Sequence, residues 1–522
     1  MLSSATGNTA KSLISVNELS DIDVKVEGIT GSLKVYGVNS RSMMEGNSEI
    51  KLSDVDIYTN TIGVESVESV ENVGIKGDAG IVNVIGKANI SVTANDLQDK
   101  EKNKVYGIWS TNGGNITING KTTISTTGGQ DIAVVAGTEG WELGEDGKLP
   151  VVEENGINTV NLNYQNGAGS EIKGDIISGY GGNITIGNAD GISTLSTRNN
   201  NGTLTLTGDA LSANGGKLSI NLTSGSTWTG RADDYQDADL KKQVESGFFN
   251  PKFSHEIAAS GTVKVNLAEG AKWDVTGQSW VTELDGNGVI NLTNGEGSDA
   301  VHIGTVKGSN TFVVNLKPDG LDTSDMLYIY DGSSAGVQNL RINNEAEVLN
   351  ALKDDGDRIR FATVGKTAGA GAGFGDDYVV RGRGVINSGF SIDYVDYEED
   401  KQNADYTTDY NGDNFDADKP GNSYVENVYG EAKGADDIDS QNLYLVRDSS
   451  KDAGKSDSGA TIINMSRANY KNAIYMDRLN KRMGEMRYVN GEEEQGLWVR
   501  LRHDRIGQSG DFRSMNTMYE VG

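Results

Sequence analysis

Two short sequence segments, which we call words, each recur about 70 residues further along the chain. This repeat constrains the fold more than any other feature of the sequence. Residues 34–40 recur almost unchanged 70 residues later, at 104–110. Residues 113–118 recur unchanged 68 residues later, at 181–186. Two independent words at one offset indicate units stacked on one another. We call each circuit of the chain around such a stack a rung, and we expect about three rungs of roughly 20–25 residues per offset.

Short strands supply these rungs. Seven segments alternate apolar and polar residues with period two, as a strand with one buried face does. We therefore expect an all-β, elongated right-handed parallel β-helix, or solenoid. About twenty rungs at ~4.8 Å each would make a rod on the order of 100 Å long. A β-sandwich is the alternative, but it does not require similar words at a fixed offset. The segments are 115–119, 183–186, 203–207, 217–222, 262–267, 289–292 and 311–316.

The composition agrees with strands joined by tight turns. The 522 residues include 69 Gly, which supply positive φ at turns, and only 4 Pro, which excludes collagen-like sequence. The absence of Cys excludes disulfides and thiolate metal sites. The net charge of −29 disfavours nucleic acid and anionic membrane surfaces as partners.

The first residues carry no export signal. Residues 1–7 have neither a basic region nor an apolar stretch, so we expect no signal peptide in this chain. The longest apolar run, 132–136, is too short for a transmembrane helix.

Two polar segments interrupt the strand pattern. The first is an insertion at 231–259, in which 237–244 could form one or two helical turns. We expect it to be a polar loop that carries binding specificity and can be deleted without unfolding the rod, with a tolerated surface loop as the alternative. The second, 396–439, has 14 acidic and 3 basic residues, so we expect an exposed acidic loop.

The C-terminal part changes character. A strand at 443–446 precedes a small, polar, linker-like segment at 449–460. A basic amphipathic helix is predicted over 466–487. The alternating segment 497–502 then predicts a strand, with 512–521 as its partner.

Residues 479–487 and 496–500 closely resemble the junction of bacterial autotransporters (type V secretion). The resemblance implies that the helix threads the pore of a twelve-stranded outer-membrane β-barrel, whose first strand is the Gly-x-Trp-x-Arg segment. Some family members cleave themselves at an Asn-Asn pair in this helix. The matching positions here are Asp477 and Arg478, so the passenger is expected to stay attached. Only 27 residues follow from Gly496, so we expect a barrel that is truncated in this chain.

A second resemblance covers roughly 210–448. Residues 224–230 look like the Trp-Thr-Gly turns of pertactin-like passengers, and 323–329 look like a strand of their C-terminal folding module. Residues 358–364 and 442–447 occupy the places of its later strands. The resemblance implies a module that caps the solenoid and from which folding starts.

These patterns predict four parts. They are a β-helix passenger at 1–300, a capping module at 301–448, a linker with its helix at 449–490, and the start of a barrel at 491–522.

Candidate chemistry is sparse, and we predict no catalytic, cofactor-binding or metal-binding residue. Residues 332–336 fit G-x-S-x-G, but strands on both sides predict a plain hairpin turn rather than a nucleophile elbow. The EF-hand-like start at 409–413 lacks the later Gly and Glu. The Gly-rich run 369–375 lacks G-x-G-x-x-G. The three scattered histidines, which form no triad or metal cluster, are His255, His302 and His503.

The function these features favour is a non-catalytic, surface-displayed passenger at the outer membrane of a Gram-negative-type bacterium. Its expected partners are host or bacterial surface molecules and, through the barrel, the outer membrane and its assembly machinery. We expect no cofactor and no nucleic acid. One alternative is a polysaccharide-active β-helix enzyme, which would use carboxylates on neighbouring rungs. The other is a structural spacer that presents a missing N-terminal domain. The carboxylate pairs expected to share a strand face are Asp21 with Asp23 and Asp54 with Asp56.

Overall fold

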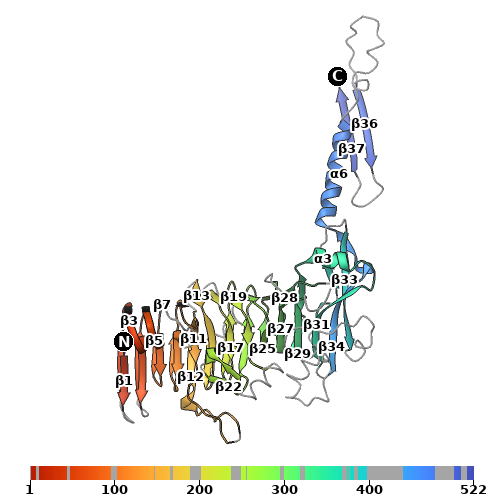
Figure 1. Ribbon diagram of the computed structural model, residues 1–522. Coiled ribbons are helices and arrows are strands. Elements are labelled where there is room, and N and C mark those ends of the chain that lie inside the picture. The colour runs from red at the N-terminus through yellow and green to blue at the C-terminus, as the bar shows by residue number, and fades with distance from the viewer. Residues whose placement is uncertain are drawn as a thin grey trace, which may run out of the picture. The chain divides into compact units, whose positions relative to one another are not determined.

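A computed structural model describes most of the chain, and the described part is mostly β-strand. The described residues are 2–6, 11–43, 47–95, 103–145, 147–164, 169–187, 202–236, 248–253, 255–293, 299–317, 324–366, 373–375, 377–380, 386–396, 439–475, 499–506 and 514–521. Large parallel sheets give a β-helix-like all-β fold (Figure 1).

The chain divides into two compact units. The first comprises Met1–Val348, Arg358–Asp376 and Ile392–Leu445. The second comprises Leu349–Asp357, Asp377–Ser391 and Val446–Gly522.

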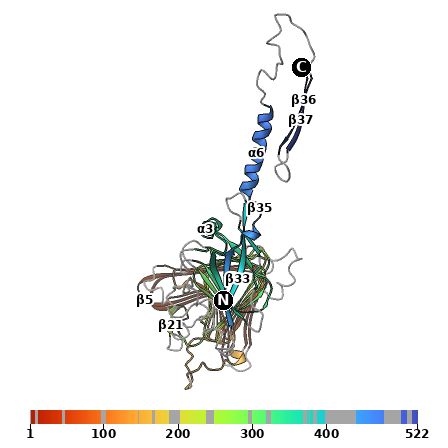
Figure 2. The same ribbon diagram turned by 90° about the vertical axis from the view of Figure 1, so that its right-hand side faces the viewer.

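One parallel sheet runs through the first unit with its strands in chain order. Twelve strands from β2 to β31 follow one another in this sheet, each parallel to the next. The turned view looks along the direction in which the strands stack (Figure 2). Eleven spacings of ~4.8 Å give about 50 Å, half the expected rod length. The strands are β2 (Lys11–Val16), β4 (Asn47–Leu52), β6 (Ile81–Val84), β9 (Asn115–Ile118), β12 (Asn158–Leu162), β15 (Gly182–Ile186), β18 (Lys217–Leu222), β23 (Thr262–Leu267), β25 (Ser279–Gly286), β27 (Ala300–Gly308), β29 (Met326–Ala335) and β31 (Arg358–Lys366).

A second sheet forms the other sides of the stack. Its long strand β3 pairs with β1 and, along most of its length, with the equally long β5. On its other side β5 pairs with two shorter strands of the next rung, β7 and β8. Rungs such as β9, β10 and β11 therefore contain three strands, whereas the rungs from β23 onward contain two. The strands of this sheet are β1 (Leu2–Thr6), β3 (Ser20–Met43), β5 (Val55–Asp78), β7 (Ala88–Asn95), β8 (Lys104–Thr111), β10 (Thr122–Thr127), β11 (Ile132–Ala136), β13 (Ser170–Lys173), β14 (Asp175–Ser178), β16 (Leu204–Thr207), β17 (Ala210–Ser212), β19 (Thr227–Gly230), β20 (Ala232–Asp233), β24 (Lys272–Val275), β26 (Val289–Asn291), β28 (Thr311–Val314) and β30 (Asn339–Ile342).

The repeated words lie two rungs apart, so the prediction of three rungs per offset is wrong. Lys34 is in register with Glu71, and Glu71 with Lys104. The reason is the third strand, which lengthens the N-terminal rungs beyond 30 residues. Rungs near the expected length occur only later, where Val289 pairs with Thr311, 22 residues onward.

The seven predicted strand segments are confirmed as β9, β15, β16, β18, β23, β26 and β28. Their period-two pattern builds the core. Ile118, Leu162, Ile186 and Ile220 follow one another in register and are fully buried. Burying each such side chain contributes roughly 1.5–3 kcal/mol.

Two predicted turns are strands or corners instead. Trp228, expected in a turn, lies in β19 and is fully buried. The G-x-S-x-G segment does not form a hairpin, because β29 continues to Ala335 and β30 pairs in parallel with β28 in the other sheet. Gly336 is therefore a corner, where the chain passes from one face of the stack to the next.

The insertion at 231–259 is partly buried, so the prediction of a polar loop is wrong for its described residues. It contains β20, a short hairpin of β21 (Phe248–Asn250) and β22 (His255–Ile257), and a 3₁₀ turn at Pro251–Phe253. Tyr235 and Ile257 are buried in an apolar cluster that also contains Leu211. The helical turns expected at 237–244 lie outside the described residues.

In the C-terminal region, β34 (Asp439–Arg447) contains the strand expected at 443–446. Helix α6 (Asp457–Tyr475) begins nine residues before the expected start at 466. The Ser456 hydroxyl accepts a hydrogen bond from Gly459 N at 2.9 Å and caps this helix, so the predicted linker at 449–460 is partly helical. The rest of the predicted helix, 476–487, lies outside the described residues, as does 397–438 of the acidic segment.

Further elements complete the C-terminal region. β36 and β37 form the antiparallel pair expected there. None of the described helices is long and apolar enough to cross a membrane. The bounds are α3 (Glu345–Ala351), β32 (Asp377–Val380), β33 (Ile386–Asp396), a 3₁₀ turn at Ser449–Lys451, β35 (Ala453–Lys455), β36 (Val499–Ile506) and β37 (Ser514–Val521).

Three rings stack across neighbouring rungs inside the first unit. His302 in β27 lies between Trp280 in β25 and Tyr328 in β29, with ring centroids 4.9 and 4.6 Å away. Burial lowers the pKa of His302 well below its usual value. We infer that the histidine is neutral and acts as a flat core residue.

A second buried titratable group, the Asp325 carboxyl, directly precedes β29. Asp325 accepts hydrogen bonds from Asn315 N at 2.7 Å and Asp299 N at 3.0 Å, yet burial raises its pKa to about 7. The folded chain therefore binds more protons than the unfolded chain between about pH 4 and 7, and this group's stabilising contribution is lost as pH rises through that window. We expect Asp325→Asn to flatten this dependence, measured as urea midpoints at pH 5 and pH 8. An unchanged difference between the two midpoints would contradict this assignment.

Candidate interaction site

A small depression lies on the flank of the stack, beside strands β8, β11 and β14. It has a volume of about 30 Å³, enough for about two water molecules. The segment between β11 and β12 and the insertion both contribute to its wall. Its principal lining residues are Trp109, Thr138, Glu139, Trp141, Tyr180 and Phe253.

Aromatic rings form much of the depression. Trp141 and Tyr180 lie 5.6 Å apart at 39°, and Tyr106 meets Trp109 edge-on at 5.6 Å. Parallel pairing brings these side chains together, because Trp109, Val135 and Ile177 occupy the same register position in three successive rungs. The result is an apolar column on the outside of the sheet, which the insertion partly covers.

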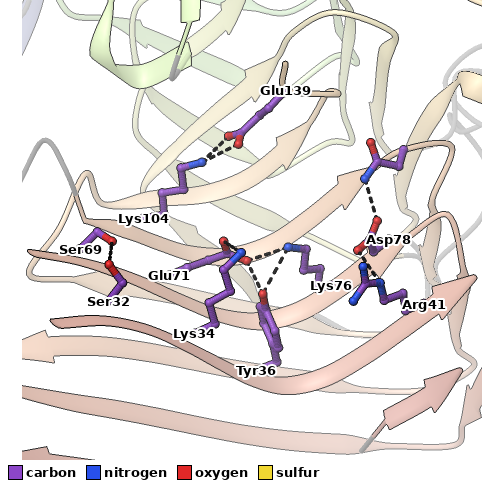
Figure 3. Close-up of polar contacts among 11 residues, drawn as sticks. Ser32, Lys34, Tyr36, Arg41, Ser69, Glu71, Lys76, Asp78, Lys104 and Glu139 are labelled. Atoms are coloured by element: carbon purple, nitrogen blue, oxygen red, sulfur yellow. Dashed lines mark hydrogen bonds and ion pairs between the residues drawn. The ribbon is translucent and has the colours of Figure 1, made fainter. Parts of the chain in front are cut away.

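A ladder of alternating charges runs beside this column (Figure 3). Glu71 accepts a hydrogen bond from the Tyr36 hydroxyl and pairs with Lys76 Nζ at 2.6 Å and Lys34 Nζ at 3.3 Å. Burial alone would raise the pKa of Glu71, but the hydrogen bonds from Lys76 and Tyr36 outweigh it and lower that pKa. Glu71 is therefore a carboxylate held between cations, which suits a structural ion pair rather than a general acid.

The ladder reaches the depression through two lysines. The Lys76 ammonium lies 3.8 Å from the centre of the Trp109 ring, a close cation–π contact. Lys104 Nζ lies 2.6 Å from both carboxylate oxygens of Glu139, as Figure 3 shows. The charges at this edge of the depression are therefore largely compensated.

Two carboxylates on neighbouring rungs pair with basic residues of the insertion. Asp175 Oδ2 is 2.6 Å from Lys252 Nζ, and its other oxygen accepts a hydrogen bond from Asp209 N at 2.8 Å. Asp209 in turn accepts from Arg231 Nε at 3.2 Å. Both carboxylates thus tie adjacent rungs and the insertion together.

The carboxylates singled out in the sequence lie elsewhere on the stack. Asp21 and Asp56 are register partners in β3 and β5, and Lys87 Nζ is 3.4 Å from Asp56. Asp54 precedes β5 and accepts a hydrogen bond from Lys87 N at 2.6 Å, so it binds backbone rather than sharing a strand face with Asp56. Asp23 lies in β3 beside Tyr58 of the next rung.

The histidines lie in three separate strands, β22, β27 and β36. His503 shares a hydrogen bond with the Thr517 hydroxyl at 2.8 Å. In the part of the chain that the structure describes, no three His, Asp or Glu residues are grouped as a metal site would require. Residues 409–413 and most of the Gly-rich run lie outside that part.

Sequence patterns alone missed the residues of the depression. The available signal was an aromatic residue within a Gly-rich segment directly after a buried strand, as at Trp141. The paired aromatics Phe248 and Phe249, inside a segment classed as polar, were a second signal.

No model of a known protein family matches the chain, and no curated protein is significantly similar to it.

Proposed function

We propose that this chain is the stalk of a bacterial autotransporter, displayed on the outer membrane and engaged in adhesion without catalysis. In this proposal the stacked sheets are a right-handed β-helix passenger, and the β36–β37 hairpin begins the membrane barrel. The observation that carries the proposal is the sidedness of this hairpin.

One face of the hairpin carries an exposed apolar patch at one end, and the same face continues with the polar pair His503 and Thr517. Val499 pairs with Val521 and Leu501 with Tyr519, and each of these side chains is at least 64% exposed. An exposed apolar face on a two-stranded ribbon is unfavourable in water, but it suits a strand pair with lipid on one side. The alternate positions on the opposite face include Arg500, Arg502 and Met518.

The stacked sheets supply the adhesive part of the proposal. Parallel rungs present repeated outward side chains, and segments such as 137–157 leave the stack between strands. Weak contacts repeated along such a surface give avidity for another surface.

A pair of arginine substitutions tests the membrane role of the hairpin. We expect Leu501→Arg with Tyr519→Arg to reduce display at least tenfold, because arginine on a lipid-facing site costs about 2–4 kcal/mol near the bilayer centre. Display is measured by flow cytometry of intact bacteria that express the natural gene with these substitutions, with an antibody against the stalk and normalisation to total protein.

The matched control is Met518→Arg, which introduces the same side chain on the face that carries Arg500 and Arg502 and should retain display. Normal display of the double variant would refute the proposal. An equal loss in both variants would show that the hairpin tolerates no arginine on either face, and it would remove the support that sidedness gives.

A further inference from the structure

We propose that the depression is a subsite for the edge of one neutral sugar ring of a glycan. This inference rests on the proposed adhesive function and specifies its ligand class. A pyranose combines an apolar C–H face with hydroxyl groups, and the depression offers partners for both.

The apolar partners are the aromatic rings. Tyr180 is partly exposed and stands against Trp141, at 5.6 Å between ring centres. Trp141 and Trp109 are only 7% and 4% exposed. They therefore form the wall and floor, and Tyr180 is the ring that a ligand can cover.

The polar partners lie next to these rings. Thr138 accepts hydrogen bonds from Asn158 Nδ2 at 2.9 Å and Asn112 N at 3.3 Å, which leaves its own hydroxyl hydrogen to donate. The Glu139 carboxylate retains acceptor capacity beyond its pair with Lys104, since ionised carboxylates have about four acceptor sites.

The charge balance favours a neutral ligand. Lys104 is paired with Glu139 and Lys252 with Asp175, each at 2.6 Å, so no strong net field draws an anion. A cationic ligand is disfavoured because the Lys76 ammonium already lies over Trp109.

The size of the depression sets the expected affinity. A volume of about 30 Å³ accepts an edge of a pyranose rather than the whole ring. Because most of the sugar stays in water, we expect a dissociation constant in roughly the millimolar range for a single ring. Adhesion would then depend on many stalks on one cell.

Saturation-transfer NMR on the full chain tests the subsite, with methyl β-D-galactopyranoside, methyl α-D-glucopyranoside and methyl α-D-mannopyranoside as probes. We expect saturable transfer from at least one of them, reduced at least fivefold by Tyr180→Ala and by Glu139→Gln. The matched control, Tyr58→Ala, removes a 46%-exposed tyrosine on β5 and should bind as the parent does. Thermal unfolding of each variant checks that the fold is retained.

Three results would overturn the inference. The first is no saturable transfer from any of the three sugars, and the second is binding by Tyr180→Ala and Glu139→Gln that equals binding by the parent. The third is transfer only from N-acetyl-tyrosine amide, which would assign the depression to a peptide. A failure of the subsite differs from a failure of the proposed function. In the first case cells still display the stalk and adhere, whereas in the second the stalk is not displayed, whatever the sugars do.

Discussion

Replacing Trp273 by alanine is expected to lower the free energy of unfolding of the stacked sheets by about 3–5 kcal/mol. Trp273 is fully buried and stacks on Trp228 of the preceding rung, with ring centres 4.5 Å apart and planes within 4°. Its indole N–H donates to Gly230 O at 2.9 Å. The substitution therefore creates a large cavity and removes the hydrogen bond of a carbonyl group.

The change is measured as the shift in the urea midpoint, followed by circular dichroism. Val151→Ala serves as the control, because Val151 is 88% exposed and its truncation should leave the midpoint unchanged. A loss below about 1 kcal/mol for Trp273→Ala would mean that the two tryptophans do not stack between rungs.

The combined substitution Tyr235→Ala and Ile257→Ala should destabilise the stalk by about 4 kcal/mol or more, since each truncation of a fully buried side chain costs about 2–5 kcal/mol. Both residues belong to the insertion, and both are members of the apolar cluster that contains Leu211. Deleting 231–259 would also remove β20 and uncover this cluster, so we expect that deletion to unfold the adjacent rungs.

Urea midpoints again give the comparison, with the exposed Ser260→Ala as the control in the same region. If the double variant unfolds at the parent midpoint, the insertion is the dispensable surface loop that its polarity suggested.

Strand positions were predictable because period-two alternation is a local property of the sequence. Rung length was not predictable from this alternation. It depends on how many corners the chain makes before it returns to the same face of the stack. The intervening rung illustrates this. Glu71 lies in register between Lys34 and Lys104, and residues 71–77 match the two repeated words poorly, although they belong to the rung between them.

A glycine shared by all three words was the better marker. A Cβ at Gly37 would lie 2.8 Å from Gly74 O, and one at Gly74 would lie 2.7 Å from Gly107 O. These close backbone approaches require glycine in each rung, so a glycine spacing near 35 residues indicates the true rung.

The candidate site was harder to foresee than the strands. Trp109 and Trp141 are separated by the three strands β9, β10 and β11, and Phe253 comes from the insertion more than 100 residues later. Only the stacking of rungs brings them together, and composition had classed the insertion as polar. The net charge of the sequence also misled, because it predicted a strongly acidic surface. The described charges around the depression are largely paired with opposite charges.

The central claim is that the stalk is displayed on the cell surface, and thiol labelling of intact bacteria tests it most directly. The chain contains no cysteine, so Val151→Cys places a single exposed thiol on the stalk. We expect a membrane-impermeant maleimide to label this variant on intact cells, with the cysteine-free parent as the blank. Labelling that appears only after the cells are lysed would contradict surface display.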